Sequence, residues 1–177
     1  MAIEESSVVA AACKSAKFWS KRGGFKTEII NVIKTGQVHF KFNGDKNKLY
    51  EFFENSKSKI LNDCNEISEN MLARGGGILN INLIDKTSEI SDYYQLSSDF
   101  NTVDSMGANF INSCLEQFAK SFETEFLESK LFDENENLEI VMSILSNYVP
   151  QCLVKAEVRC KLNELKNGDV EEPIKFA

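Results

Sequence analysis

The stretch that decides the fold runs from residue 104 to residue 126 and reads DSMGANFINSCLEQFAKSFETEF. Its apolar residues recur at steps of three and four, which places them on one face of an amphipathic α-helix. They are Phe110, Ile111, Cys114, Leu115, Phe118, Phe122 and Phe126. The pattern predicts a helix over residues 105–129, with Asp104 as its N-cap and Gly107 in its first turn.

The beginning of this helix has two interpretations. In an ordinary helix, an aspartate at this place accepts hydrogen bonds from the backbone N–H groups of the first turn. The same N–H groups, the positive end of the helix dipole and a glycine without a Cβ also make an anion-binding site. The residues by themselves leave both interpretations open.

The pattern upstream and downstream of this helix predicts an α+β fold. Alternating or continuous apolar residues predict strands over residues 38–42, 78–85, 92–100 and 138–145, the last as a central strand. A long helix is expected between the turn and cap at residues 43–45 and the glycines at 75–77. The order strand, helix, strand, strand, helix, strand is that of a ferredoxin-like split βαβ unit (βαββαβ), an antiparallel sheet with two helices on one face.

Further elements flank this unit on both sides. Apolar residues from Val8 to Trp19 predict an N-terminal helix over residues 7–22, capped by Ser6 or Ser7 and ended by Gly23 and Gly24. Residues 24–34 are expected to be extended, with a break at Gly36. A last strand is expected over residues 154–162, and the tail 166–177 has no core-forming pattern. The domain boundaries are therefore placed at residues 1–35, 36–148 and 149–177.

Composition argues against several classes of function. A net charge of −7 and a pI near 4.9 argue against nucleic acid as the partner, because phosphate binding needs clustered lysine and arginine. Five cysteines without paired spacing fit reduced thiols in a cytoplasmic protein. One histidine and the lack of a Cys-x-x-Cys pair argue against a zinc site. No apolar run approaches the ~20 residues of a membrane span.

Two further features have ordinary interpretations. His39 alternates with Val38 and Phe40 on a half-buried strand, so its side chain is expected to point away from the apolar face. Gly75 to Gly77 are not a phosphate loop, because no Gly-Lys-Ser/Thr sequence follows them. They are expected to cap the preceding helix or to allow close approach of a ligand or of neighbouring backbone.

Three separated segments resemble one enzyme family. Residues 4–12 read EESSVVAAA and resemble the EEPSVVAAA stretch of the bacterial-type (class II) 3-hydroxy-3-methylglutaryl-CoA (HMG-CoA) reductases. Residues 104–109, DSMGAN, resemble their DAMGAN signature, and residues 144–147, ILSN, resemble the end of one of their strands. Gly75 to Gly77 also fall where this family has a glycine run. The resemblance spans nearly the whole chain and covers the small, NAD(P)-binding domain of such an enzyme with flanking pieces of its large domain.

The resemblance implies an activity, a cofactor and partners. The family reduces HMG-CoA to mevalonate and free CoA in a four-electron reaction with NADH or NADPH, a step of isoprenoid biosynthesis. It implies an active site at a dimer interface, so a homo-oligomer is expected in the full enzyme. Cofactor choice is expected to depend on the second half of the long helix, at Ser68 or its neighbours Glu66 and Glu69.

The resemblance also implies the roles of individual residues. Glu5 matches the family's catalytic glutamate, which takes part in proton transfer. Ser7 and Asn147 match residues that contact the substrate. The signature residues would place backbone N–H groups against the phosphates of the dinucleotide. These are Asp104, Met106, Gly107, Ala108 and Asn109.

Two departures from the family pattern limit what is expected of this chain. Ser6 stands where the family has proline, and the family's catalytic lysine, aspartate and histidine match nothing among these 177 residues. His39 lies in the wrong segment to replace that histidine. The 177 residues are therefore expected to be inactive alone. The alternative hypothesis is a non-catalytic, ferredoxin-like regulatory or assembly domain, in which Asp104 to Gly107 merely begin a helix.

Overall fold

The structure is a computed structural model that describes residues 5–165 of the 177-residue chain. The described chain divides into two compact units, one of residues 31–152 and the other of residues 5–30 with 153–165. The tail predicted at residues 166–177 lies outside the described residues.

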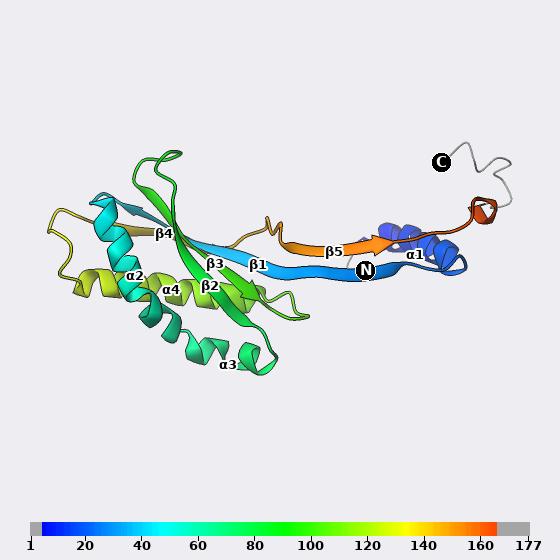
Figure 1. The fold of residues 1–177 in the computed structure, drawn as a ribbon, viewed down its shortest axis with the longest axis horizontal. Helices are drawn as coiled ribbons and strands as arrows, with labels where there is room; N and C mark the ends of the chain where they lie inside the picture. The colour runs from blue at the N-terminus through cyan, green and yellow to red at the C-terminus, as the bar shows by residue number, and fades with distance from the viewer. Residues whose placement is uncertain (1–4, 166–177) are drawn as a thin grey trace. The chain divides into compact units, whose positions relative to one another are not determined.

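An antiparallel sheet forms the larger unit, as the sequence predicts (Figure 1). Its strands are β1 (Lys26–Phe42), β2 (Gly77–Asp85), β3 (Tyr93–Asn101) and β4 (Leu138–Leu145). They lie in the order β2-β3-β1-β4, and each neighbouring pair is antiparallel. Only the part of β1 from Asn31 onward belongs to this unit.

Three helices cover one face of this sheet: α2 (Lys46–Asn62), α3 (Asn65–Ala73) and α4 (Ala108–Glu128). Their apolar residues pack against alternate residues of the strands. Side chains with at most 1% exposure include Val38, Phe40, Phe42, Leu49, Phe53, Leu96, Phe100, Ile111, Leu115, Phe118 and Phe122. The apolar face predicted for residues 110–126 is therefore the face of α4 that forms the core, with Phe110 at its margin.

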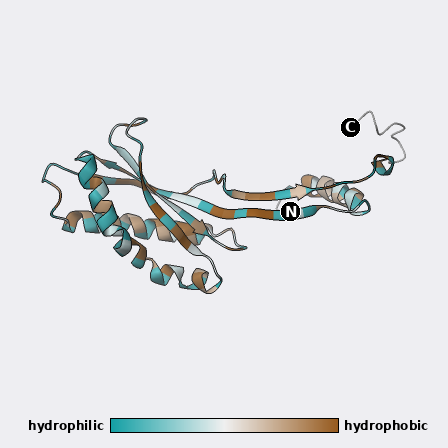
Figure 2. Cartoon of the chain, viewed as in Figure 1, coloured by the Kyte–Doolittle hydropathy of each residue, from teal (hydrophilic) through white to brown (hydrophobic). Residues whose placement is uncertain are grey.

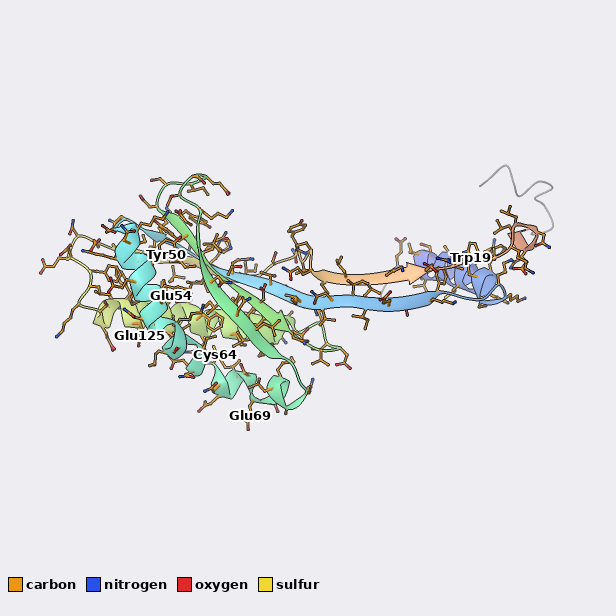
Figure 3. The ribbon with its side chains drawn as sticks, viewed as in Figure 1. Trp19, Tyr50, Glu54, Cys64, Glu69 and Glu125 are labelled. Carbon is orange, nitrogen blue, oxygen red and sulfur yellow. The ribbon has the colours of Figure 1, made fainter. Side chains whose placement is uncertain are left out.

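The prediction of one long helix over residues 46–73 is wrong, because the helix breaks at Asp63 and Cys64. The Asp63 carboxylate accepts hydrogen bonds from Lys59 Nζ at 2.7 Å and from Ser121 Oγ of α4 at 2.7 Å. The thiol of Cys64, at the junction of α2 and α3 in Figure 3, is buried and points at the Cys114 carbonyl oxygen 3.7 Å away. The break allows α3 to take a new direction while both helices keep contact with α4.

Two predictions about the strands are also wrong. Gly36 does not interrupt β1. The glycine instead makes room for Leu115 of α4, since a Cβ there would lie 2.6 Å from Leu115 Cδ1. β4 is an edge strand and not a central one, since it pairs only with β1 in this unit. Its apolar residues Val141, Met142 and Ile144 are accordingly 43–49% exposed.

The smaller unit contains α1 (Ser6–Ser20), the first residues of β1, all of β5 (Cys152–Glu157) but its first residue, and a 3₁₀ turn (Leu162–Leu165). β5 pairs with β1 and is shorter than the predicted strand. No described side chain of this unit is buried. Several large apolar side chains are exposed on it, namely Val8, Val9, Phe25, Ile29, Ile30, Leu153, Val154 and Leu162. Figure 2 shows apolar stretches along β1 and β5.

The cap predicted for α1 is shifted. Glu5 occupies the N-cap position, and neither Ser6 nor Ser7 precedes the helix. The Glu5 side chain makes no capping hydrogen bond to the first-turn N–H groups of α1. Asp45, in contrast, caps α2 as predicted, since its carboxylate accepts from the N–H groups of Asn47 and Lys48.

The loop before β4 is fastened to the beginning of α2 by Glu136. Its carboxylate accepts from the backbone N–H of Asp45 at 2.7 Å, from that of Asp133 at 2.8 Å and from Lys48 Nζ at 2.8 Å. The Lys48 ammonium, followed by the two N–H groups, lowers the pKa of Glu136 from 4.5 to about 2. The ionised carboxylate therefore stabilises the folded state.

We predict that Glu136→Gln lowers the free energy of unfolding near neutral pH. The variant's stability should also change less than that of wild type as the pH is lowered. A carboxyl whose pKa is depressed in the folded state stabilises above its unfolded pKa, and this stabilisation is lost as the pH falls through the folded value. The wild-type chain should therefore lose stability between pH 4.5 and about pH 2, measured by urea unfolding at each pH. Glu134→Gln, the same change at an exposed neighbouring residue, is the control. Parallel pH curves for wild type and Glu136→Gln would contradict the role of this carboxylate.

Candidate functional site

The signature residues lie at one end of the sheet of the larger unit. β3 and β4 are both antiparallel to β1 and flank it on opposite sides, so their carboxyl ends meet at the same end of the sheet. Asn101, the last residue of β3, pairs with Ile33, and Leu145, the last of β4, pairs with Gly36. The turn over residues 102–107 leaves β3 there, and Asn147 follows the end of β4.

The turn is closed by hydrogen bonds among its own residues. The Thr102 carbonyl oxygen accepts from Ser105 N at 3.0 Å and from Ser105 Oγ at 2.8 Å, and Thr102 Oγ1 donates to the Ser105 carbonyl at 2.8 Å. Val103 adopts a positive φ of 55°, which is uncommon for a β-branched residue and costs about 1–2 kcal/mol. Asn101 Oδ1 accepts from the N–H of Val103 at 2.8 Å and so helps to hold this conformation.

Lys34 of β1 ties the turn to the sheet, and the sequence analysis did not identify it. Its ammonium donates to Thr102 Oγ1 at 2.9 Å, to the Ser105 carbonyl at 2.7 Å and to the Met106 carbonyl at 2.8 Å. All three protons of the ammonium are used. The sequence around a lysine in an extended, β-branched segment does not indicate contacts with residues some 70 positions away.

The helix begins differently from the prediction. α4 starts at Ala108, Gly107 is its N-cap residue with φ 73° and ψ 9°, and no side chain caps it. Asp104 is exposed and precedes the helix by one turn, so its assignment as the N-cap is wrong. Gly107 is required by its own turn: a Cβ there would lie 2.3 Å from Thr102 Cγ2. The group that approaches this glycine is therefore Thr102.

The uncapped start leaves a run of backbone donors. From Met106 to Phe110, no backbone N–H has an acceptor among the residues that the structure describes, and the first intrahelical bond of this end is from Ile111 N to the Gly107 carbonyl at 2.9 Å. These N–H groups stand at the positive end of a 21-residue helix, next to the Lys34 ammonium. A left-handed glycine among consecutive N–H groups also shapes anion-binding turns. The arrangement suits a phosphate or diphosphate.

The other predicted residue of this unit, Asn147, is exposed just beyond β4. The end of that strand is fastened on two sides. Ser146 N donates to the Thr35 carbonyl at 2.9 Å, and Leu145 N donates to Asn112 Oδ1 of α4 at 3.0 Å. Asn147 therefore stands on a fixed strand end, at the end of the sheet that also carries the 102–107 turn.

Glu5 and Ser7 belong to the smaller unit. The Ser7 hydroxyl donates to Glu5 Oε1 at 3.1 Å, so the structure brings these two predicted residues together at the start of α1. Both side chains are exposed.

Other candidate features have structural explanations. His39 lies on the sheet face opposite the core, where its Nδ1 meets Tyr93 Oη at 2.9 Å and Gln95 Nε2 at 3.2 Å, and burial lowers its pKa. Gly75 ends α3 with φ 85°, and Gly76 approaches the backbone so closely that a Cβ would lie 2.4 Å from the Asn101 carbonyl oxygen. Both interpretations of this glycine run are thus confirmed, with backbone as the neighbour.

Within residues 5–165, no group of three or more His, Cys, Asp or Glu side chains is arranged to hold a metal ion. Of the helices in that same range, none has the length and apolar character to cross a lipid bilayer.

We predict that Gly107→Ala destabilises the chain more than Gly75→Ala. Both glycines have positive φ, so alanine costs about 1–2 kcal/mol at either place. A Cβ at Gly75 meets nothing within 4 Å, whereas one at Gly107 overlaps Thr102, which adds about 1–3 kcal/mol. Urea unfolding of both variants measures the difference. Equal losses would show that Thr102 does not require a glycine at position 107.

Comparison with known proteins identifies the family of this chain. The model of the hydroxymethylglutaryl-coenzyme A reductase family matches residues 1–173. A probable 3-hydroxy-3-methylglutaryl-coenzyme A reductase of Borreliella burgdorferi is 30% identical over 170 residues, which are 95% of this chain and 35% of that protein. The reductase of Archaeoglobus fulgidus is 32% identical over 125 residues, covering 70% of this chain and 28% of its own length.

Solved structures agree as well. The class II reductase of Streptococcus pneumoniae bound to NADPH in open conformations matches 93% of this chain and 42% of its own, with a TM-score of 0.65 and 27% identity. Another structure of the reductase from that organism matches 98% of this chain and 44% of its own, with a TM-score of 0.70 and 26% identity. The chain thus spans less than half the length of each of these relatives. It belongs to the hydroxymethylglutaryl-coenzyme A reductase family.

Proposed function

We propose that this chain is the cofactor-binding portion of an HMG-CoA reductase and binds NADH or NADPH at the start of α4. The whole enzyme would reduce HMG-CoA to mevalonate and CoA. NADPH is the ligand of the related Streptococcus pneumoniae structure. The observation that carries the proposal is the run of N–H groups from Met106 to Phe110 without acceptors among the described residues.

The charge and chemistry of this turn fit a dinucleotide diphosphate. The diphosphate is an anion, and backbone N–H groups at a helix N-terminus bind such groups without a cationic side chain. The Lys34 ammonium adds a positive charge but donates its protons to the turn, so its part is to hold the N–H groups in place. When bound, the cofactor supplies the hydride for the reduction.

The roles proposed for the signature residues differ from one another. Gly107 keeps the turn tight against Thr102, and Ala108 and Asn109 contribute N–H groups of the first helical turn. Met106 is 80% exposed and is therefore placed to contact a ligand with its side chain. Asp104 is exposed and outside the helix, and its part in cofactor binding rests on the resemblance alone.

The substrate-side residues complete the proposal. Glu5 would exchange protons with the oxygen atoms of the reacting thioester and aldehyde, and the Ser7 hydroxyl at 3.1 Å would orient its carboxylate. Asn147 would hold the substrate near its carbonyl group, using an amide on a fixed strand end. That these 177 residues are inactive without the family's lysine, aspartate and histidine stays a prediction.

We also propose a ferredoxin-like small domain over residues 36–148 with large-domain flanks at 1–35 and 149–177. The strand order β2-β3-β1-β4 with antiparallel neighbours supports the ferredoxin-like topology. The exposed apolar side chains of the smaller unit support a contact with other parts of a dimeric reductase. A cytoplasmic location is proposed because all five cysteines are free thiols.

We predict that Asn109→Asp weakens the binding of both NADPH and NADH at least about tenfold. A carboxylate in the first turn of α4 favours the helix through the dipole but repels a phosphate at the same N–H groups. The change keeps the size of the side chain and should not lower the melting temperature. Titration of the 177-residue chain with each cofactor, followed by its nicotinamide fluorescence, measures the effect.

The matched control is Asn55→Asp on α2, an exposed position where the same change of charge is made away from the turn. It should bind both cofactors as the wild-type chain does. If the Asn109→Asp and Asn55→Asp variants bind the cofactors with equal affinity, the turn before α4 is not part of the cofactor site. Absence of any binding to the wild-type chain would favour the alternative, a regulatory or assembly domain.

A further inference from the structure

A cavity of about 250 Å³ lies between α3 and the first two turns of α4. Three of its lining residues are apolar and the other four are polar or charged, a mixture found in many ligand sites. The lining residues are Ile67, Asn70, Met71, Arg74, Asn109, Phe110 and Ser113. Asn109 belongs both to this lining and to the N–H run of α4, so the cavity adjoins the proposed diphosphate site.

Arg74 is the charged residue of this lining, and no carboxylate is among the residues named. It is the C-cap residue of α3, and its side chain is exposed. Within residues 5–165, its guanidinium takes part in no ion pair. A guanidinium that no carboxylate neutralises, beside an apolar cavity, is suited to a phosphate attached to a ring system.

The size of the cavity limits what it can hold. Sites that enclose a drug-sized ligand begin at roughly 300 Å³. A cavity of about 250 Å³ therefore takes one end of a dinucleotide and leaves the remainder outside. Of the two ends of NADPH, only the adenosine end carries a further phosphate for the Arg74 guanidinium, so we assign the adenosine to the cavity.

We propose that Arg74 binds the 2′-phosphate of the adenosine ribose and makes this chain select NADPH over NADH. This inference rests on the proposed function, since it needs the diphosphate at the start of α4. A basic residue near that ribose accommodates the 2′-phosphate, whereas a carboxylate there would hydrogen-bond to the free 2′-hydroxyl of NADH.

The residues that the sequence predicted for this choice do not line the cavity. Ser68 is only 3% exposed and is not among the lining residues. Glu66 and Glu69 are exposed but are absent from the lining, and Figure 3 shows Glu69 on the outer side of α3. The side of α3 that faces the cavity carries instead Ile67, Asn70, Met71 and Arg74, which follow one another at helical spacing.

Coenzyme A also contains a phosphorylated adenosine, so its binding to Arg74 must be distinguished from that of NADPH. Coenzyme A carries its ribose phosphate at the 3′ position, and a guanidinium binds either phosphate. The position of the cavity next to the N–H run of α4 favours the dinucleotide. Adenosine 2′,5′-bisphosphate and adenosine 3′,5′-bisphosphate are small probes that separate the two sources.

The test is a set of calorimetric titrations of the 177-residue chain with NADPH, NADH, the two bisphosphates and adenosine 5′-monophosphate. We predict that wild type binds NADPH and the 2′,5′-bisphosphate at least about tenfold more tightly than NADH and the monophosphate. Arg74→Gln should remove this preference and leave the NADH affinity unchanged, and Arg74→Lys should keep part of it. Lys120→Gln removes the same charge at an exposed residue of α4 and should change nothing.

The outcomes separate this inference from the proposed function. Equal binding of NADPH and NADH by wild type, or an equal loss of both in Arg74→Gln, overturns the role of Arg74 while the dinucleotide site stands. A preference for the 3′,5′-bisphosphate that Arg74→Gln abolishes overturns the assignment to NADPH in favour of coenzyme A. Failure of wild type to bind either dinucleotide overturns the proposed function, and this inference with it.

Discussion

The contact of Lys34 with the 102–107 turn is the interaction on which the candidate site depends. One ammonium on β1 donates to Thr102 Oγ1 and to the carbonyl oxygens of Ser105 and Met106. The same turn is tightly packed, because Thr102 leaves no room for a Cβ at Gly107. Together these contacts fix where α4 begins and which way its first N–H groups point.

The position of α4 is fixed further along the helix by packing. Gly36 allows Leu115 to lie against β1, and Asn112 Oδ1 accepts from the N–H at the end of β4. The core that follows, with Phe118 and Phe122 fully buried, keeps the helix rigid. A rigid helix presents its N-terminal donors in one arrangement, so a bound phosphate does not have to order them first.

The sequence was sufficient for what depends on local periodicity. The apolar face of α4 and the alternation of Val38, Phe40 and Phe42 were predictable because burial repeats with the period of each element. The break between α2 and α3 was not predictable, because it depends on Ser121 and Cys114 of α4, which lie 58 and 50 positions further along the chain. The edge position of β4 could not be predicted either, since a run of apolar residues does not show how many neighbouring strands a strand has.

The resemblance to the family identified more of the candidate-site residues than the residue pattern did. The pattern led to Asp104 as a helix cap, whereas Gly107 holds that position and leaves the N–H groups without a capping side chain. The resemblance identified the segments that carry the turn, Asn147 and the Glu5–Ser7 pair. Neither approach could identify the contacts of Lys34, or that Arg74 and Asn109 line the same cavity. These features depend on how segments distant in the sequence pack together.

The central claim is that the backbone N–H groups from Met106 to Phe110 bind the diphosphate of the cofactor. The most direct measurement is amide chemical-shift mapping of the isotope-labelled 177-residue chain during titration with NADPH. If these groups bind the diphosphate, their amide signals should move most, in the direction of stronger hydrogen bonding. Saturable binding that leaves these signals in place and shifts those of another surface would contradict it.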